Sequence, residues 1–141
     1  MITYLKEIID AGKPMLYLYL INLFLDIFTP FYQVFGWFDS PMHIMGGYAA
    51  AWSVYRYMTM YPKFSIKTSS QYVDYFLFAS ATASIAVVWE VYELITSEIF
   101  NVVMQPTVFD TVKDMVLGMV GATIYVYYKK IRLKTYKKIT K

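Results

Sequence analysis

The chain of 141 residues contains no cysteine and only one histidine, His43. The absence of cysteine excludes disulfide bonds and metal sites built on thiolate ligands. Any metal ion must therefore be bound by oxygen atoms and, at most, one imidazole. A lone histidine that belongs to an acidic cluster is also not available to activate a serine nucleophile, which argues against serine hydrolase chemistry.

Glycine is also scarce, with six copies, and no serine lies in the glycine-rich turn that exposes a catalytic nucleophile. Gly46 and Gly47 lie inside an apolar, helix-forming stretch, so they indicate close helix packing rather than a phosphate-binding loop. The basic C-terminal residues have only Tyr136 as a nearby aromatic, and no known recognition fold surrounds them. The sequence therefore predicts no nucleic-acid partner.

Apolar residues, by contrast, are abundant: 58% of the chain is hydrophobic, 20% is aromatic, and the mean hydropathy is +0.41. Four segments reach or approach the roughly 20 residues that cross a hydrocarbon core about 30 Å thick. They cover residues 14–37, 41–60, 72–100 and 111–128. The connections are too short to form a separate soluble core, and helices satisfy their own backbone polar groups in lipid. We therefore predict an all-α fold, a four-helix transmembrane bundle in which residues 1–141 form a single integral membrane domain.

Two other interpretations of the apolar segments are less favoured. A soluble helical bundle would need an unusually apolar surface. A cleaved signal peptide would need a small-residue cleavage site after the first apolar segment, and none follows it. We therefore expect the first helix to be retained.

The distribution of basic residues predicts the orientation of the bundle. All but one of the thirteen lysines and arginines lie before the first segment, around the connection between the second and third, or after the fourth. The exception is Lys113. The positive-inside rule then places both termini and the middle connection in the cytoplasm. The basic tail, residues 129–141, anchors this topology and could also bind anionic lipid, so membrane lipids are the expected partners.

With this topology, most of the ten carboxylates lie in the outer half of the bundle or in its outer connections. They are Asp26, Asp39, Glu90, Glu93, Glu98, Asp110 and Asp114. Three pairs have helical spacing, namely Asp39 with His43, Glu90 with Glu93, and Asp110 with Asp114. Residues three or four apart share a helix face. At about 1.5 Å of rise per residue, the three pairs should occupy one layer of the membrane.

Small residues continue two of these helix faces. Gly46 and Gly47 follow His43 in the second segment, and Gly118 and Gly121 follow Asp114 in the fourth. Such residues allow helix backbones to approach closely. Close packing would therefore aim the polar pairs at a common centre.

The predicted layer has an electrostatic requirement. An ionised carboxylate in the middle of a membrane helix costs about 2.5–3.5 kcal/mol even on a lenient scale, and neighbouring carboxylates repel one another. The cluster must therefore be protonated, open to outside water, or neutralised by a bound cation. Asp26, with Asn22 one turn away, is a candidate for a deeper member of this polar layer.

Asp39 and Asp110 also have a simpler interpretation. Each opens a predicted helix after a loop, and an aspartate in that position commonly caps the first turn. We therefore interpret these two residues as helix N-caps first and as metal ligands second. Capping does not explain His43 and Asp114, which lie one turn further in.

Three motifs occur in order along the chain. They are Asp39-x-x-x-His43-x-x-Gly46, Trp89-Glu90-x-x-Glu93 and Asp110-Thr111-x-x-Asp114-Met115-x-x-Gly118-x-x-Gly121-Ala122. They resemble the YjdF family of small polytopic membrane proteins and, more distantly, the VanZ-like group. The VanZ pattern has a basic residue at the position of Ser40 and an asparagine at that of Asp114, so the YjdF-like pattern is the better match. The resemblance covers the second to fourth helices, and it implies the architecture of a multi-pass protein of the prokaryotic cell membrane.

The function that we rank first is binding of one or two divalent cations near the outer leaflet. The candidate ligands are His43, Glu90, Glu93 and Asp114, with Asp39 and Asp110 assisting. A bound cation could activate water or polarise a phosphate, and so support hydrolysis or transfer on a lipid head group or cell-envelope substrate. Mg, Mn, Ca and Zn all suit such ligands.

Two other functions remain open. The cluster could exchange protons or ions in a small carrier or carrier subunit, and the polar pair of Asp26 and Asn22 favours this second option. In the third interpretation, which is purely structural, the polar groups only form hydrogen bonds between helices, although such bonds contribute on average only about 0.6 kcal/mol each. The glycine faces would also permit a homo-oligomer.

Overall fold

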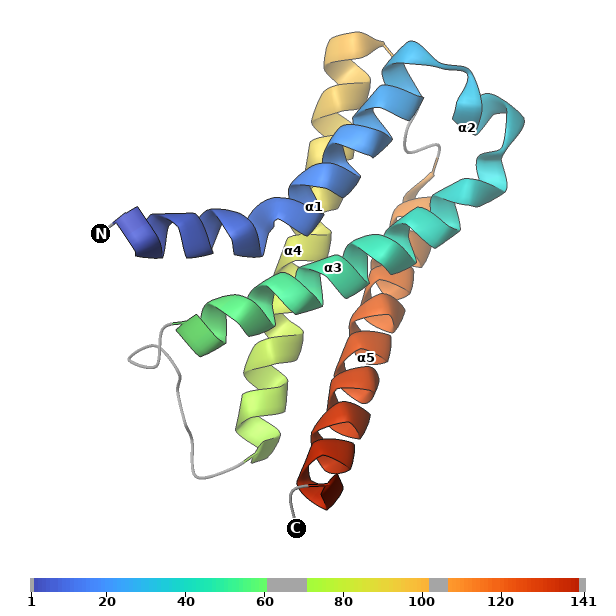
Figure 1. Ribbon diagram of the computed structural model, residues 1–141. Helices are drawn as coiled ribbons and strands as arrows, with labels where there is room; N and C mark the ends of the chain where they lie inside the picture. Colours follow the sequence, from blue (N-terminus) through green and yellow to red (C-terminus); the bar gives the residue numbers. More distant parts are fainter. Residues whose placement is uncertain (1, 61–70, 102–106, 140–141) are drawn as a thin grey trace.

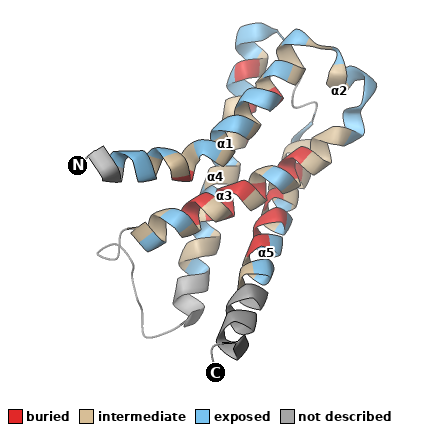
Figure 2. Ribbon diagram, in the orientation of Figure 1, coloured by how far each residue is buried: buried red, intermediate tan, exposed pale blue. Residues whose placement is uncertain are grey.

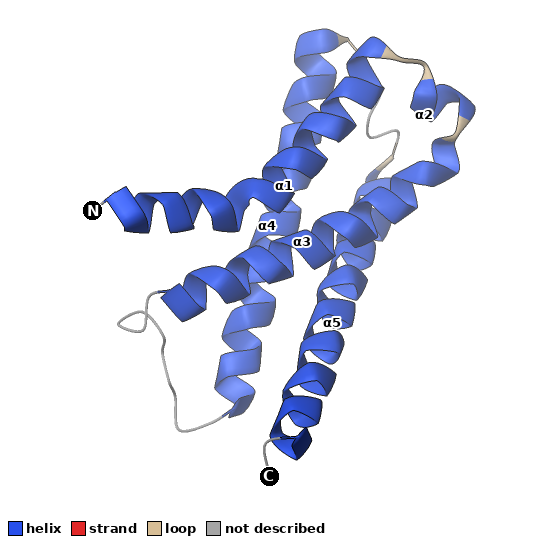
Figure 3. Cartoon of the chain, in the orientation of Figure 1, coloured by secondary structure: helices blue, strands red, loops and turns tan. Residues whose placement is uncertain are grey.

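A computed structural model of the chain describes residues 2–60, 71–101 and 107–139, and the side chains within 5–60, 76–101 and 107–129. These residues are helical, with no β-strand among them (Figure 3). The elements are α1 (Ile2–Phe28), α2 (Phe31–Val34), the 3-10 helix η1 (Gly36–Phe38), α3 (Asp39–Met60), α4 (Gln71–Phe100) and α5 (Val108–Ile139). The described part of the chain is therefore all-α, as predicted.

The first helix differs most from its predicted bounds of 14–37. It runs over Ile2–Phe28, and α2 and η1 form the remainder of the apolar segment. The break follows from Pro30, which has no backbone N–H and disfavours helical geometry in the residue before it. Pro14 lies inside α1 and accounts for the change of direction in its N-terminal half (Figure 1). The predicted bounds were therefore wrong at both ends, because hydropathy records composition and not backbone breaks.

The last helix is longer than predicted. The apolar segment expected over 111–128 begins at Val108 and continues as α5 to Ile139. Lysine and arginine are good helix formers, so the end of an apolar stretch does not end a helix. The side chains that would bind anionic lipid in this tail lie mostly outside the described residues.

Helices α3 and α5 pack against each other more extensively than any other pair. A Cβ atom built on Gly47 would overlap the backbone carbonyl of Gly118, and one on Gly121 would overlap that of Ile44. No side chain other than hydrogen fits at these two positions, because the backbones are in direct contact. This crossing fixes the height of His43 on α3 relative to α5.

The long faces of α1 and α4 are apolar and outward-facing. Leu5–Phe28 and Phe76–Phe100 are each long and apolar enough to cross a membrane, and only 11% and 17% of their most apolar windows are buried. Figure 2 shows the buried residues concentrated along α3 and α5 instead. An exposed apolar surface of this extent is typical of helices that face lipid rather than a protein core. Two candidate spans are thus found among the described residues, whereas four spans and the orientation of the termini stay predictions.

Candidate metal centre

His43 lies one turn into α3 and is surrounded by carboxylates from three helices. Its Nε2 atom faces three of them: Asp39 Oδ1 at 3.3 Å, Glu93 Oε1 at 3.8 Å and Asp114 Oδ2 at 3.8 Å. Its Nδ1 atom faces Glu90 Oε1 at 3.8 Å. The structure therefore brings together residues from all three predicted pairs, with the imidazole at their centre.

Most of these groups are shielded from the surroundings of the chain. His43, Glu90, Glu93 and Asp114 are 8%, 6%, 4% and 3% exposed. One oxygen of Asp114, Oδ1, is fully buried and accepts no hydrogen bond from the described residues. A buried carboxylate oxygen without a hydrogen bond is destabilising unless a cation stabilises it.

The distances around Nε2 fit a shared cation better than hydrogen bonds. Separations of 3.3–3.8 Å exceed the usual N–H···O range of about 2.7–3.2 Å. Ligand atoms bonded at about 2.0–2.2 Å with tetrahedral angles lie about 3.3–3.6 Å from one another. The separation from Asp39 lies in this range, and those from Glu93 and Asp114 at 3.8 Å lie just beyond it. Two overlapping groups, Asp39–His43–Asp114 and His43–Glu90–Glu93, place one ligand atom from each residue within 4.8 Å of the others. Either group could hold a metal ion.

Lys113 is a member of the site that sequence analysis missed. Its Nζ atom lies 2.5 Å from Asp110 Oδ1, 3.3 Å from Asp114 Oδ1 and 3.7 Å from Asp39 Oδ2. In the sequence Lys113 stands out only as an exception to the charge distribution, although its spacing of three from Asp110 is typical of an ion pair on one helix face. The ammonium group of Lys113 therefore supplies a positive charge at one edge of the site.

The helix-cap interpretation of the two aspartates is wrong. Thr107 caps α5, because its Oγ1 accepts a hydrogen bond from the backbone N–H of Asp110 at 3.1 Å. Asp39 follows η1 directly and has helical dihedrals, φ −53° and ψ −49°, whereas an N-cap residue has non-helical ones. The carboxylates of Asp39 and Asp110 are thus free of capping and pair with Lys113 instead.

Trp89 is the second residue that sequence analysis did not place in the site. Its Nε1–H donates a hydrogen bond of 2.7 Å to Glu93 Oε1, and its ring lies edge-on to the imidazole of His43, with centroids 6.3 Å apart. The spacing of four residues between Trp89 and Glu93 places both side chains on one helix face, so the contact is predictable from the sequence. The indole holds the carboxylate oxygen that faces His43.

Asn22 and Asp26 form a separate polar network on α1. Asn22 is buried, and its Nδ2 donates to Asp26 Oδ2 at 3.2 Å. The hydroxyl of Tyr32 donates to Asn22 Oδ1 at 2.5 Å. These hydrogen bonds connect α1 with α2, and neither of them involves His43.

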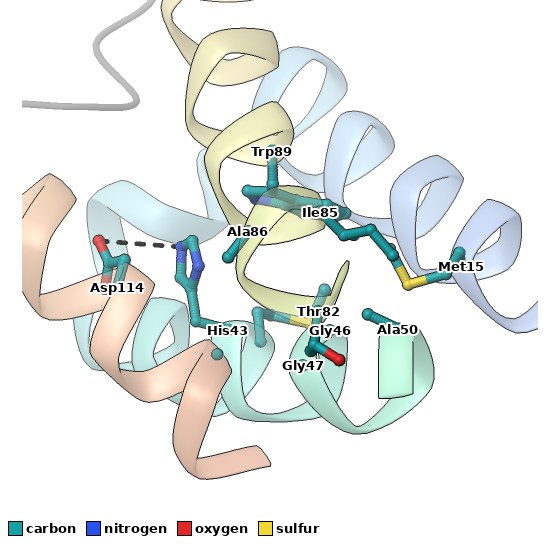
Figure 4. Close-up of a pocket in the computed structure, with 12 residues that line it drawn as sticks. Met15, His43, Gly46, Gly47, Ala50, Thr82, Ile85, Ala86, Trp89 and Asp114 are labelled. Atoms are coloured by element: carbon teal, nitrogen blue, oxygen red, sulfur yellow. Dashed lines mark ion pairs between the residues drawn. The ribbon is translucent and has the colours of Figure 1, made fainter. Parts of the chain in front are cut away.

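A small cavity of about 20 Å³ adjoins the cluster. His43 and Asp114 line its polar end (Figure 4). The opposite end is lined by Met15 of α1, Ala50 of α3 and Thr82 of α4. The cavity is therefore mostly apolar and reaches from the carboxylate cluster into the interior of the bundle.

Apolar, outward-facing helices around a buried histidine and carboxylate cluster define a helical membrane protein with a polar site between its helices. The chain belongs to the family described as "Predicted membrane protein (DUF2238)", whose model matches residues 10–135. This match confirms the resemblance to the YjdF-like family, which is the same family. The more distant link to the VanZ-like group stays a prediction. No curated protein and no solved structure matches the chain.

Proposed function

We propose that the chain is a multi-pass membrane protein that binds one divalent cation at the His43 cluster, near the extracytoplasmic face. One observation carries this proposal: His43 Nε2 faces three carboxylate oxygens at 3.3–3.8 Å, without a hydrogen bond to Glu93 or Asp114 at those distances.

We assign different roles to the two imidazole nitrogens. A neutral imidazole can bind a metal through one nitrogen while the other keeps its proton. Nε2 has three carboxylates around it and Nδ1 has one, Glu90. We therefore assign Nε2, Asp39 and Asp114, which form one of the two groups, as ligands. We add Glu93 as a fourth ligand because its Oε1 also faces Nε2, and we assign Glu90 as the carboxylate that orients the ring. Oxygen ligands with one imidazole suit Mg, Mn, Ca or Zn.

A cation at this position would support chemistry on an anionic head group. It supplies electrostatic stabilisation to a phosphoryl or carbonyl oxygen of a substrate that enters from the membrane. We propose a hydrolase or transferase acting on a lipid head group or cell-envelope substrate in the prokaryotic cell membrane. The basic residues favour cytoplasmic termini, and the distant resemblance to VanZ-like proteins favours the cell envelope. Membrane lipids, anionic lipid at the tail and a second copy of the chain are the proposed partners.

Metal analysis of purified protein tests the proposal. Chelator-treated protein in detergent is titrated with Mn²⁺, and bound metal is measured by elemental analysis and calorimetry. We expect one ion per chain in the wild type and none in His43→Ala or Glu93→Gln. Glu98→Gln is the matched control, because Glu98 lies on the same helix but is exposed. Wild-type protein that binds no divalent metal would overturn the proposal.

The carrier function is the second candidate, favoured by the partly buried network of Asn22, Asp26 and Tyr32 on another part of the bundle. A polar chain of this kind inside a membrane is typical of ion or proton pathways. Reconstituted vesicles should then show cation- or proton-dependent flux that Asp26→Asn removes. Flux that is equal in this variant and the wild type would exclude Asp26 as a carrier residue, and a purely structural bundle would show neither flux nor bound metal.

A further inference from the structure

We propose that Lys113 occupies a second cation position in a carboxylate-bridged centre, and that its ammonium group limits the chain to one metal ion. The first cation position, at Nε2 of His43, rests on the proposed function. The second position rests on the contacts of Lys113 alone. Its oxygen atoms come from Asp39, Asp110 and Asp114.

Asp39 and Asp114 each present one carboxylate oxygen to the histidine and the other to the lysine. Oδ1 of Asp39 lies 3.3 Å from His43 Nε2, and its Oδ2 lies 3.7 Å from Lys113 Nζ. Oδ2 of Asp114 lies 3.8 Å from Nε2, and its Oδ1 lies 3.3 Å from Nζ. Carboxylates that place one oxygen at each of two cations are typical ligands of binuclear metal centres in helical bundles. The two aspartates therefore define two adjacent cation positions rather than one.

Three carboxylate oxygens converge on the ammonium group of Lys113. Besides the two bridging aspartates, Asp110 contributes Oδ1 at 2.5 Å from Nζ. Asp114 is only 3% exposed, and its Oδ1 accepts no hydrogen bond from the described residues, so the ammonium at 3.3 Å is the cation that this oxygen faces. Three oxygens form half of an octahedral set, which Mg²⁺ and Mn²⁺ complete with water. The oxygens around the lysine are therefore a ligand set for a divalent ion.

The charge of the cluster also favours two cationic positions. Its basic groups are His43 and Lys113, and the carboxylates around them are those of Asp39, Glu90, Glu93, Asp110 and Asp114. Neighbouring ionised carboxylates repel one another unless cations lie between them. A divalent ion together with the ammonium group compensates more of this charge than a metal ion alone. Lys113 thus supplies the second cation without a second metal.

The lysine position is open to the surroundings of the chain, whereas the histidine position is not. The Lys113 side chain is 34% exposed, against 7% for His43 and 4% for Asp114. Lysine carries a compact charge on a long, flexible stem. Its replacement by an uncharged side chain removes the charge from a place that ions and water can reach. Loss of the ammonium group should therefore open the second position to a metal.

The test counts metal ions on full-length protein in detergent. Chelator-treated protein is titrated with Mn²⁺, and bound metal is measured by elemental analysis and electron paramagnetic resonance. We expect one ion per chain in the wild type and two in Lys113→Met, because the three oxygens then lack their ammonium. The two ions should give the spectrum of an exchange-coupled pair, since two-metal sites hold ions about 3.5–4 Å apart. Lys113→Met that binds no more ions than the wild type would overturn the proposal, as would two ions in the wild type.

Further variants separate charge, position and fold. Lys113→Arg keeps the positive charge and should bind one ion, as should Lys129→Met, which removes a lysine further along α5. Lys113→Gln should bind two ions and covers failure of Lys113→Met to fold. Lys113→Met combined with Asp110→Ala loses an oxygen of the second position and should return to one ion; a count that stays at two would place the second ion elsewhere and overturn the proposal.

A double variant separates this proposal from the proposed function. Lys113→Met combined with His43→Ala loses the first position and should bind one ion without exchange coupling. Wild-type protein that binds no metal, together with one ion in Lys113→Met, would keep the second position and overturn the proposed function.

Discussion

The Nζ atom of Lys113 lies 3.3 Å from Oδ1 of Asp114, the buried oxygen that accepts no hydrogen bond from the described residues. The same ammonium is within ion-pair distance of Asp39 and Asp110. Lys113 therefore neutralises part of the cluster when no metal is bound. Asp39 and Asp114 are also proposed metal ligands, through the oxygens that face His43, so the lysine and the metal would share the negative charge of the same two carboxylates.

Lys113→Met should raise the affinity for a divalent cation roughly tenfold, because it removes a competing and repelling positive charge. The gain is limited because about a third of the lysine side chain is exposed, where solvent screens its charge. Calorimetric titration with Mn²⁺ measures the change. Lys129→Met removes the same charge from α5 at a position 16 residues further along the chain and should leave the affinity unchanged. Lower affinity in Lys113→Met would contradict the proposed electrostatic effect.

Glu90→Gln and Glu93→Gln should differ, although the two residues lie one turn apart. Glu93 is proposed as a direct ligand, so its amide variant should lose measurable binding. Glu90 orients the imidazole through Nδ1, and loss of such an outer partner typically weakens metal binding by about 10–100-fold. Elemental analysis with calorimetry separates the two results, and the opposite order would reverse the assignment of the ring nitrogens.

Cation binding should weaken as the pH falls. The ligands must be deprotonated to bind a metal, so protons compete at His43 and at the carboxylates. Titrations from about pH 8 to about pH 5 cross the usual range of imidazole, and the apparent affinity should decrease throughout. The release of protons on binding, measured in two buffers of different ionisation enthalpy, provides an independent check. Affinity that is independent of pH would mean that His43 is not a ligand.

Gly46→Ala and Gly47→Ala should change stability in opposite directions. A methyl group at Gly47 would overlap the carbonyl of Gly118, and overpacking of this kind destabilises by about 1–3 kcal/mol. A methyl group at Gly46 enters open space and should stabilise the helix by about 0.5–1 kcal/mol. Thermal unfolding in detergent, without lipid or metal, measures both effects. Equal destabilisation would show that Gly46 is packed against a neighbour.

Around His43, helical spacing predicts the contacts within one helix but not the contacts between α3, α4 and α5. Asp39 and His43 are four residues apart in α3, and the structure places Asp39 Oδ1 3.3 Å from His43 Nε2. Contacts between helices depend on the crossing of α3 and α5, which local spacing does not specify. Helical spacing therefore predicts the residues that gather there, but not which nitrogen of His43 faces which carboxylate.

Lys113 and the break at Pro30 were missed for different physical reasons. A lysine has a long, flexible side chain, so its charge can lie several ångströms from the position that its backbone suggests. Hydropathy averages over a window, so the apolar residues after Pro30 concealed the end of α1. The proline itself was the better signal, because its backbone chemistry acts at a single residue.

The direct backbone contacts of Gly47 with Gly118 and of Gly121 with Ile44 also have a mechanical consequence. Sliding of packed helices is easier where side chains can adjust between them. At these two points the backbones touch directly, so α3 and α5 should behave as one rigid body. Any widening of the cavity beside His43 must then come from movement of α1 or α4. Because α4 carries Glu90 and Glu93, its displacement would withdraw two carboxylates from His43, and movement of this helix would be coupled to release of the cation.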